Sequence, residues 1–116
     1  MGSLLEGVAV LAWVYLAVAI LAEVSGTVAL RFVSGLSRPV PLAIVVAGYG
    51  LAFYLLMRTL KLLSLGLTYA VWAGAGTALV AIVGMLALDE PVNAPKLLGI
   101  VLVIAGIVTL NLGGAH

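Results

Sequence analysis

The stretch "ILAEVSGTVALRF", residues 20–32, places one carboxylate, that of Glu23, inside a long apolar run. The run extends from about Val8 to Phe32, and about 20 apolar residues suffice to cross the roughly 30 Å hydrocarbon core of a bilayer. The rest of the chain is similar: of 116 residues, 66% are hydrophobic and only 8% are charged. Membrane strands alternate polar and apolar residues, whereas these runs are continuously apolar. The sequence therefore predicts an all-α integral membrane protein.

The length of the chain allows four membrane crossings and leaves no room for a soluble domain. Turn signals separate the apolar runs at Ser34 to Pro39, at the short segment Lys61 to Gly66, and at the polar connection Asp89 to Pro95. In this last connection Asn93 is the expected N-cap of the final helix, and Pro95 lies in the first turn. We expect one transmembrane domain over residues 1–116, with helices at about 8–32, 39–60, 67–88 and 94–112.

The loop charges give little preference for one orientation in the membrane. Four crossings put both termini and the second loop on one side, which carries Arg58 and Lys61. The first and third loops lie on the other side, which carries Arg31, Arg38 and Lys96. Because orientation follows the Lys/Arg difference between short loops, we expect copies in both orientations. The alternative is that position-specific effects fix a single orientation.

Glu23 is the only acid expected inside a span. A charged residue at the bilayer centre costs at least about 2.5–3.5 kcal/mol, and such residues usually face a bundle interior or a water-filled cavity. A carboxylate in this position suits both protons and cations, and the alternative is a protonated glutamate that only hydrogen-bonds another helix. Ala19, Gly26 and Thr27 lie on the same helical face. These small residues either admit a neighbouring helix or leave room for a bound guest.

The third helix carries the motif "YAVWAGAG" at residues 69–76. Tyr69 and Trp72 share one face, and Tyr49 of the second helix can join them to form an aromatic site for organic cations. Interfacial placement of these aromatic residues is the alternative. Gly74 and Gly76 lower helix propensity in the middle of the span, which predicts a conformational hinge, or else simple close packing.

The fourth helix carries the motif "GIVLVIAG" at residues 99–106. A stripe of small side chains permits close approach of two helices within a membrane, where van der Waals contact drives association. The stripe predicts a dimer interface, with contact inside one monomer as the alternative. The residues expected in this dimer interface are Gly99, Leu102, Val103 and Gly106.

The composition excludes several classes of function. The chain has no cysteine, its single histidine is the terminal His116, and no acidic cluster accompanies it, so we expect no metal or other cofactor. No basic cluster suits a nucleic-acid partner. No pair of nucleophile and base indicates an enzyme. Glu6 replaces the basic residues that begin a signal peptide, so we expect the first helix to be retained.

Together, "AEVSGT" at 22–27 and the motifs at 69–76 and 99–106 resemble those of the small multidrug resistance family of bacterial inner-membrane exporters. The resemblance covers about Leu11 to Leu112. It implies an antiparallel, dual-topology homodimer in membrane lipid, in which Glu23 binds protons and lipophilic cations in alternation. Gly26 and Tyr49 are similar to the quaternary-ammonium and multidrug branch, because guanidinium exporters tend to carry Trp at the position of Gly26.

Two residues depart from the family pattern. Ala52 and Ala73 stand where related proteins often carry a hydroxyl side chain, so the substrate range implied by the resemblance is open. The alternatives are a guanidinium or polyamine exporter of the same family, or an accessory membrane subunit without transport activity.

Overall fold

The computed structural model describes residues 2–33 and 39–113, which form four helices and no strand. The prediction of four apolar, membrane-spanning helices is confirmed for this part of the chain. The loop expected after residue 33 and the terminal His116 lie outside the described residues. The four helices are α1 (Gly2–Leu30), α2 (Pro39–Leu60), α3 (Leu65–Ala87) and α4 (Ala94–Leu112).

The bounds of two helices differ from those expected. α1 begins at Gly2 rather than near Val8, because no proline or turn signal interrupts the chain before the apolar run, and Glu6 therefore lies inside the helix. It ends at Leu30 rather than near Phe32, because the amides of the next residues turn back three positions, with Phe32 N bonded to Ala29 O at 2.9 Å. α3 covers Leu65–Ala87 rather than 67–88.

The other two helices have the expected bounds, and their first residues explain why. Pro39 begins α2 and Pro41 lies in its first turn, where a missing amide hydrogen leaves no helical hydrogen bond unmade. Asn93 caps α4 as expected, because its side chain accepts a hydrogen bond from the amide of Lys96 at 3.0 Å. At 1.5 Å per residue, α2 reaches about 33 Å, which is enough to cross a bilayer core.

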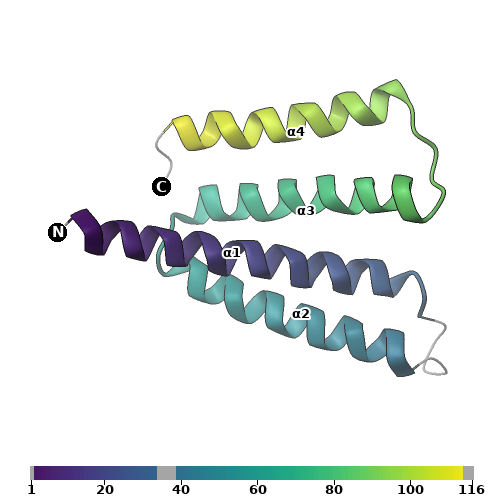
Figure 1. Cartoon of the computed structure of the whole chain (residues 1–116), viewed down its shortest axis with the longest axis horizontal. Coiled ribbons are helices and arrows are strands. Elements are labelled where there is room, and N and C mark those ends of the chain that lie inside the picture. The colour runs from purple at the N-terminus through teal and green to yellow at the C-terminus, as the bar shows by residue number, and fades with distance from the viewer. Residues whose placement is uncertain (1, 34–38, 114–116) are drawn as a thin grey trace.

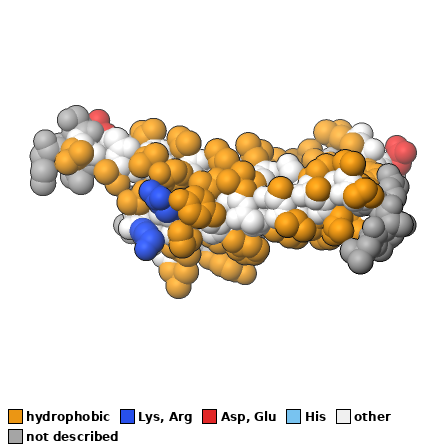
Figure 2. Space-filling model, turned by 90° about the horizontal axis from the view of Figure 1, so that it is seen from below, with side chains coloured by type: hydrophobic (Ala, Val, Ile, Leu, Met, Phe, Trp, Pro, Cys, Tyr) orange, Lys and Arg blue, Asp and Glu red, His pale blue; other side chains and the backbone are white. Residues whose placement is uncertain are grey.

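The helices run alternately up and down, so the start of α1, the α2–α3 connection and the end of α4 lie at one end of the molecule (Figure 1). The α3–α4 connection lies at the opposite end. The space-filling view shows an apolar surface, with acidic side chains near both ends and basic side chains toward the end where α1 begins (Figure 2). A surface of this kind suits lipid contact along the helices.

α1 packs against both α2 and α3, most extensively against α2. A buried apolar cluster joins Leu16, Ile20 and Val24 of α1 with Leu67 and Val71 of α3. Against α2, the approach is close enough that a Cβ on Gly48 would lie 2.8 Å from the carbonyl oxygen of Ala22. Small residues at this contact let the two backbones touch.

α4 lies at the edge of the bundle and packs mainly on α3. A Cβ on Gly74 would lie 2.9 Å from Ile107 Cδ1 and 3.1 Å from Val103 Cγ1, so this glycine admits the side chains of α4. No residue of α4 is buried within the part of the chain that the structure describes. The outer faces of α4 are therefore available to lipid or to another protein.

Candidate functional site

Glu23 lies half-buried in α1 and is held by a side chain one helical turn away. The hydroxyl of Thr27 donates a hydrogen bond of 2.8 Å to Glu23 Oε1. The same hydroxyl oxygen lies 2.8 Å from the hydroxyl of Tyr49 on α2. Because the single proton of Thr27 is used toward Glu23, Tyr49 is the donor in the second bond. This series of hydrogen bonds, from Tyr49 through Thr27 to Glu23, fixes the orientation of the carboxylate.

The second carboxylate oxygen of Glu23 faces α3. A Cβ on Gly76 would lie 3.2 Å from Glu23 Oε2, so glycine at this position leaves room for the carboxylate. α3 is a continuous helix from Leu65 to Ala87. In this arrangement Gly76 serves close approach to Glu23, and Gly74 serves close approach to α4. A hinge at Gly74 and Gly76 stays a prediction.

A cavity of about 510 Å³ lies between α1 and α3 and includes Glu23 and Thr27 in its wall; we call it the Glu23 cavity. Its α3 wall is a stripe of residues three and four positions apart, from Trp72 to Ala81. Its volume falls within the range of roughly 300–1,000 Å³ that is usual for ligand pockets. Mostly apolar walls beside the carboxylate of Glu23 suit a lipophilic cation.

The predicted aromatic residues are connected through a fourth ring that sequence reasoning missed. Trp72 meets Tyr69 edge-on, with ring centroids 5.9 Å apart, and meets Phe53 of α2 in the same way at 5.8 Å. Phe53 in turn lies 6.5 Å from Tyr49. Helical spacing could have identified Phe53 from the sequence, since it follows Tyr49 by one helical turn.

Only one of the three predicted aromatic residues lines the Glu23 cavity. That residue is Trp72, whose indole nitrogen is buried and has no hydrogen-bond partner among the described residues. Tyr49 contacts Thr27 instead, and Tyr69 is 59% exposed. Trp72 therefore supplies the aromatic wall of the cavity, and contacts of Tyr49 and Tyr69 with a substrate stay predictions.

Ala19 and Gly26 lie at helix contacts and outside the wall of the cavity. Ala19 is fully buried. A Cβ on Gly26 would lie 3.1 Å from the ring of Tyr49, so this glycine accommodates the tyrosine from α2. Of the three small residues predicted on the Glu23 face of α1, only Thr27 lines the cavity. A role for Ala19 and Gly26 in substrate binding stays a prediction.

The four residues predicted for a dimer interface face in two directions. Gly99 and Gly106 are exposed, with open space where a Cβ would stand, and Leu102 is also exposed. Val103 points inward toward Gly74 of the same chain. Three of the four residues are thus available to a second copy, and the dimer itself stays a prediction.

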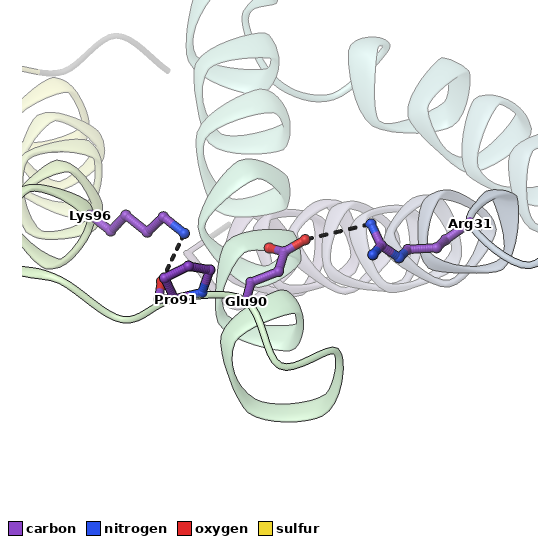
Figure 3. Close-up of polar contacts among 4 residues, drawn as sticks. All are labelled: Arg31, Glu90, Pro91 and Lys96. Atoms are coloured by element: carbon purple, nitrogen blue, oxygen red, sulfur yellow. Dashed lines mark hydrogen bonds and ion pairs between the residues drawn. The ribbon is translucent and has the colours of Figure 1, made fainter.

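Sequence reasoning also missed an acidic residue at the end of the cavity. Glu90, in the connection between α3 and α4, belongs to the wall of the Glu23 cavity. Its carboxylate forms an ion pair of 3.8 Å with Arg31, which follows α1 (Figure 3). Helical spacing could have identified Arg31 from the sequence. Glu23, Thr27 and Arg31 follow one another at intervals of four residues, which places them along one face.

A family model described as "Small Multidrug Resistance protein" matches residues 11–103. The chain belongs to the small multidrug resistance family. The resemblance drawn from the three sequence motifs is thereby confirmed. Membership, together with four helices that are long and apolar enough to cross a membrane, identifies a multi-pass protein of the bacterial inner membrane.

Relatives in the small multidrug resistance family align over most of their length. Multidrug resistance protein EbrA of Bacillus licheniformis is 42% identical over 100 residues, which are 86% of this chain and 95% of the relative. Quaternary ammonium compound-resistance protein QacF of Klebsiella aerogenes is 44% identical over 100 residues, 86% of this chain and 91% of the relative. Multidrug resistance protein EbrB of Bacillus licheniformis is 44% identical over 98 residues, 84% and 82% of the two chains.

Proposed function

We propose that this protein exports hydrophobic and quaternary ammonium cations across the inner membrane in exchange for protons, with both competing for Glu23. The observation that carries the proposal is the position of Glu23 in the wall of a cavity of about 510 Å³, together with Trp72. The name of the relative QacF, which refers to resistance to quaternary ammonium compounds, supports the same class of substrate. The protein acts as a transporter and not as an enzyme.

Coupling follows from the cost of an unneutralised charge in the membrane. An ionised carboxylate at this depth is unfavourable by at least about 2.5–3.5 kcal/mol, and either a proton or a bound cation neutralises it. The two cannot occupy one carboxylate together, so arrival of the proton displaces the cation. A proton gradient directed inward therefore drives the cation outward when access to the cavity switches between the two faces.

The shape of the site supports broad selectivity among cations. Thr27 and Tyr49 hold the carboxylate in one orientation by hydrogen bonds. Trp72 offers an aromatic wall, and cation–π contacts contribute about 2 kcal/mol or more when water is excluded. Neither the cation–π contact nor the apolar contact requires a particular hydrogen-bond pattern on the guest. Cations of different shape are therefore accepted.

We further propose an antiparallel homodimer as the transporting unit. Each helix of a single chain must also meet lipid, and α4 exposes Gly99, Leu102 and Gly106 to a possible partner. In an antiparallel pair the inward-facing and outward-facing states are equivalent by exchange of subunit roles, so neither state is strongly favoured. The segment around Gly74 and Gly76 is the element that bends during the switch.

Transport by reconstituted protein tests the role of Glu23. Liposomes with an acidic lumen accumulate a quaternary ammonium dye when they contain the wild-type protein, and the Glu23→Gln variant abolishes this accumulation. Glu6→Gln is the matched control, since Glu6 is an exposed glutamate of the same helix, far from the cavity. Equal accumulation by Glu23→Gln and wild type would refute the proposal. Flux of guanidinium or polyamines in place of the dye would reassign the substrate class.

A further inference from the structure

Glu90 is directed back onto α3 by the turn that precedes it. Asp89 has φ of 57°, the left-handed conformation that aspartate tolerates better than most residues. The amides of Leu88 and Glu90 both donate to the carbonyl oxygen of Gly84, at 3.1 and 3.0 Å. The backbone thus reverses over the last turn of α3 and brings the side chain of Glu90 to the wall of the Glu23 cavity.

A glycine in α3 makes room for the carboxylate of Glu90. A Cβ on Gly84 would lie 2.7 Å from Glu90 Cδ and would collide with Oε1. Gly76 makes room for Glu23 on the same helix in the same way. The two glycines are eight residues apart, which corresponds to about 12 Å along a helix. Each carboxylate of the cavity therefore lies over its own glycine, with Val80 and Ala81 of the wall between them.

Arg31 occupies the position opposite Glu90. The two side chains are 59% and 40% exposed, and their closest charged atoms are 3.8 Å apart (Figure 3). Ion pairs of this exposure contribute little to stability, because water screens both partners. An ammonium group arriving in the cavity can therefore replace Arg31 at Glu90 with little loss.

We propose that Glu90 is a second cation-binding residue of the Glu23 cavity, and that the two carboxylates together select elongated dications. One cationic group lies at Glu23 and the other replaces Arg31 at Glu90, with an apolar linker along the α3 stripe between them. A bis-quaternary ammonium compound with charges about 12 Å apart fits this spacing. The inference rests on the proposed function, because it assumes that Glu23 binds organic cations.

The test compares dications with monocations of matched length on the full chain in lipid nanodiscs. The probes are bis(trimethylammonium)alkanes of increasing chain length and alkyltrimethylammonium ions, with binding measured by calorimetry. For each variant, the readout is the ratio of dication to monocation affinity. In the wild type we expect this ratio to rise to a maximum where the two charges are about 12 Å apart.

Two variants of the ion pair separate a binding role from a purely structural one. Glu90→Gln lowers the ratio at that length by roughly three- to fivefold, the effect of losing one partly exposed ion pair. Arg31→Gln raises the ratio by a similar factor, because it removes the competing cation. Asp89→Asn is the control, since it removes a neighbouring charge while asparagine tolerates the same turn, and it leaves the ratio unchanged.

The outcomes are distinct. A ratio that does not depend on chain length in the wild type, or that survives Glu90→Gln, overturns the inference. A shift in the same direction for Glu90→Gln and Arg31→Gln also overturns it, because loss of a structural ion pair affects both alike. If binding of the monocations does not depend on Glu23, the proposed function is refuted instead.

Discussion

Thr27 is the residue through which two helices hold the central carboxylate. It lies one turn after Glu23 and donates to it, while Tyr49 of α2 donates to Thr27. The position of Thr27 was predictable from helical spacing, because residues four apart share a face. The contact with Tyr49 was not predictable, since it depends on how α1 and α2 pack.

Replacing Thr27 by Val tests this arrangement at nearly constant volume. The carboxylate loses the hydroxyl that donates to it, and hydrogen bonds to charged groups are worth about 1.5–3 kcal/mol. We expect the affinity for a quaternary ammonium cation at fixed pH to fall by about tenfold or more, as measured by calorimetry.

Thr109→Val is the matched control for that change. The hydroxyl of Thr109 donates only to the carbonyl oxygen of Ala105 on its own helix, at 2.7 Å. This variant retains wild-type affinity. Equal affinities for Thr27→Val and Thr109→Val would show that the hydroxyl chain does not support binding.

At the same scale, the residues missed by sequence reasoning share a physical cause. Phe53 joins Trp72 only because α2 and α3 come together. Glu90 was expected in the polar connection before the last helix, and it reaches the cavity through the left-handed conformation of Asp89 and the space at Gly84. Backbone turns and contacts between helices of this kind leave no periodic signal in one sequence.

At the scale of elements, hydropathy predicted the helices well and their contacts poorly. The first residues of α2 and α4 follow from Pro39 and Asn93, which are local signals. The helices are apolar on every side, so no amphipathic pattern tells which face meets which neighbour. Glycine contacts supply that information in the structure, as Gly48 does for α1 and Gly74 for α4.

Gly48→Ala tests the close contact between α1 and α2. The added methyl group would lie 2.8 Å from the carbonyl oxygen of Ala22 and 3.2 Å from the amide nitrogen of Gly26, so the backbones must separate. We expect a loss of about 1–3 kcal/mol in the free energy of unfolding in detergent micelles, as overpacking typically causes.

Gly50→Ala on the same helix is the control. Nothing lies within 4 Å of the position of its Cβ, and alanine favours the helical state over glycine. Its stability equals or exceeds that of the wild type. If Gly48→Ala is as stable as Gly50→Ala, the two helices are less tightly packed than described.

The exposed face of α4 can be tested in the same manner. Gly106→Leu places a large side chain in open space of the single chain, so the fold of the monomer is retained. In the proposed dimer it blocks close approach of the helices, and we expect a shift toward monomer in analytical ultracentrifugation. Val108→Leu, on roughly the opposite face of α4, is the control and stays dimeric. Dimerisation of Gly106→Leu at wild-type strength would place the interface elsewhere.

At the scale of the whole molecule, charges at the two ends of the bundle are nearly balanced. Arg31 and Lys96 lie at the end with the α3–α4 connection, and Arg58 and Lys61 lie at the other. Arg58 is held by its neighbours, since it donates to the hydroxyl of Tyr54 at 3.1 Å and lies 5.6 Å from the ring centre of Tyr15. Lys61 is therefore the better position for altering charge without disturbing packing.

Lys61→Gln tests the prediction of dual orientation. It leaves a clear excess of basic residues at the opposite end, which the positive-inside rule assigns to the cytoplasm. We expect an alkaline phosphatase fused to the C-terminus to gain activity, and a fluorescent protein fused there to lose fluorescence. Lys61→Arg keeps the charge and the wild-type ratio of the two signals. An unchanged ratio in Lys61→Gln would indicate an orientation fixed by other features.

The indole of Trp72, whose nitrogen has no hydrogen-bond partner among the described residues, gives the protein an intrinsic optical reporter. The chain has two tryptophans, and the other, Trp13, packs against the buried apolar cluster. A Trp13→Phe chain would emit only from the cavity wall, and the emission wavelength of an indole follows the polarity of its surroundings. The entry of a cation into the cavity, or of water in its place, would then shift the fluorescence emission wavelength of an unlabelled protein.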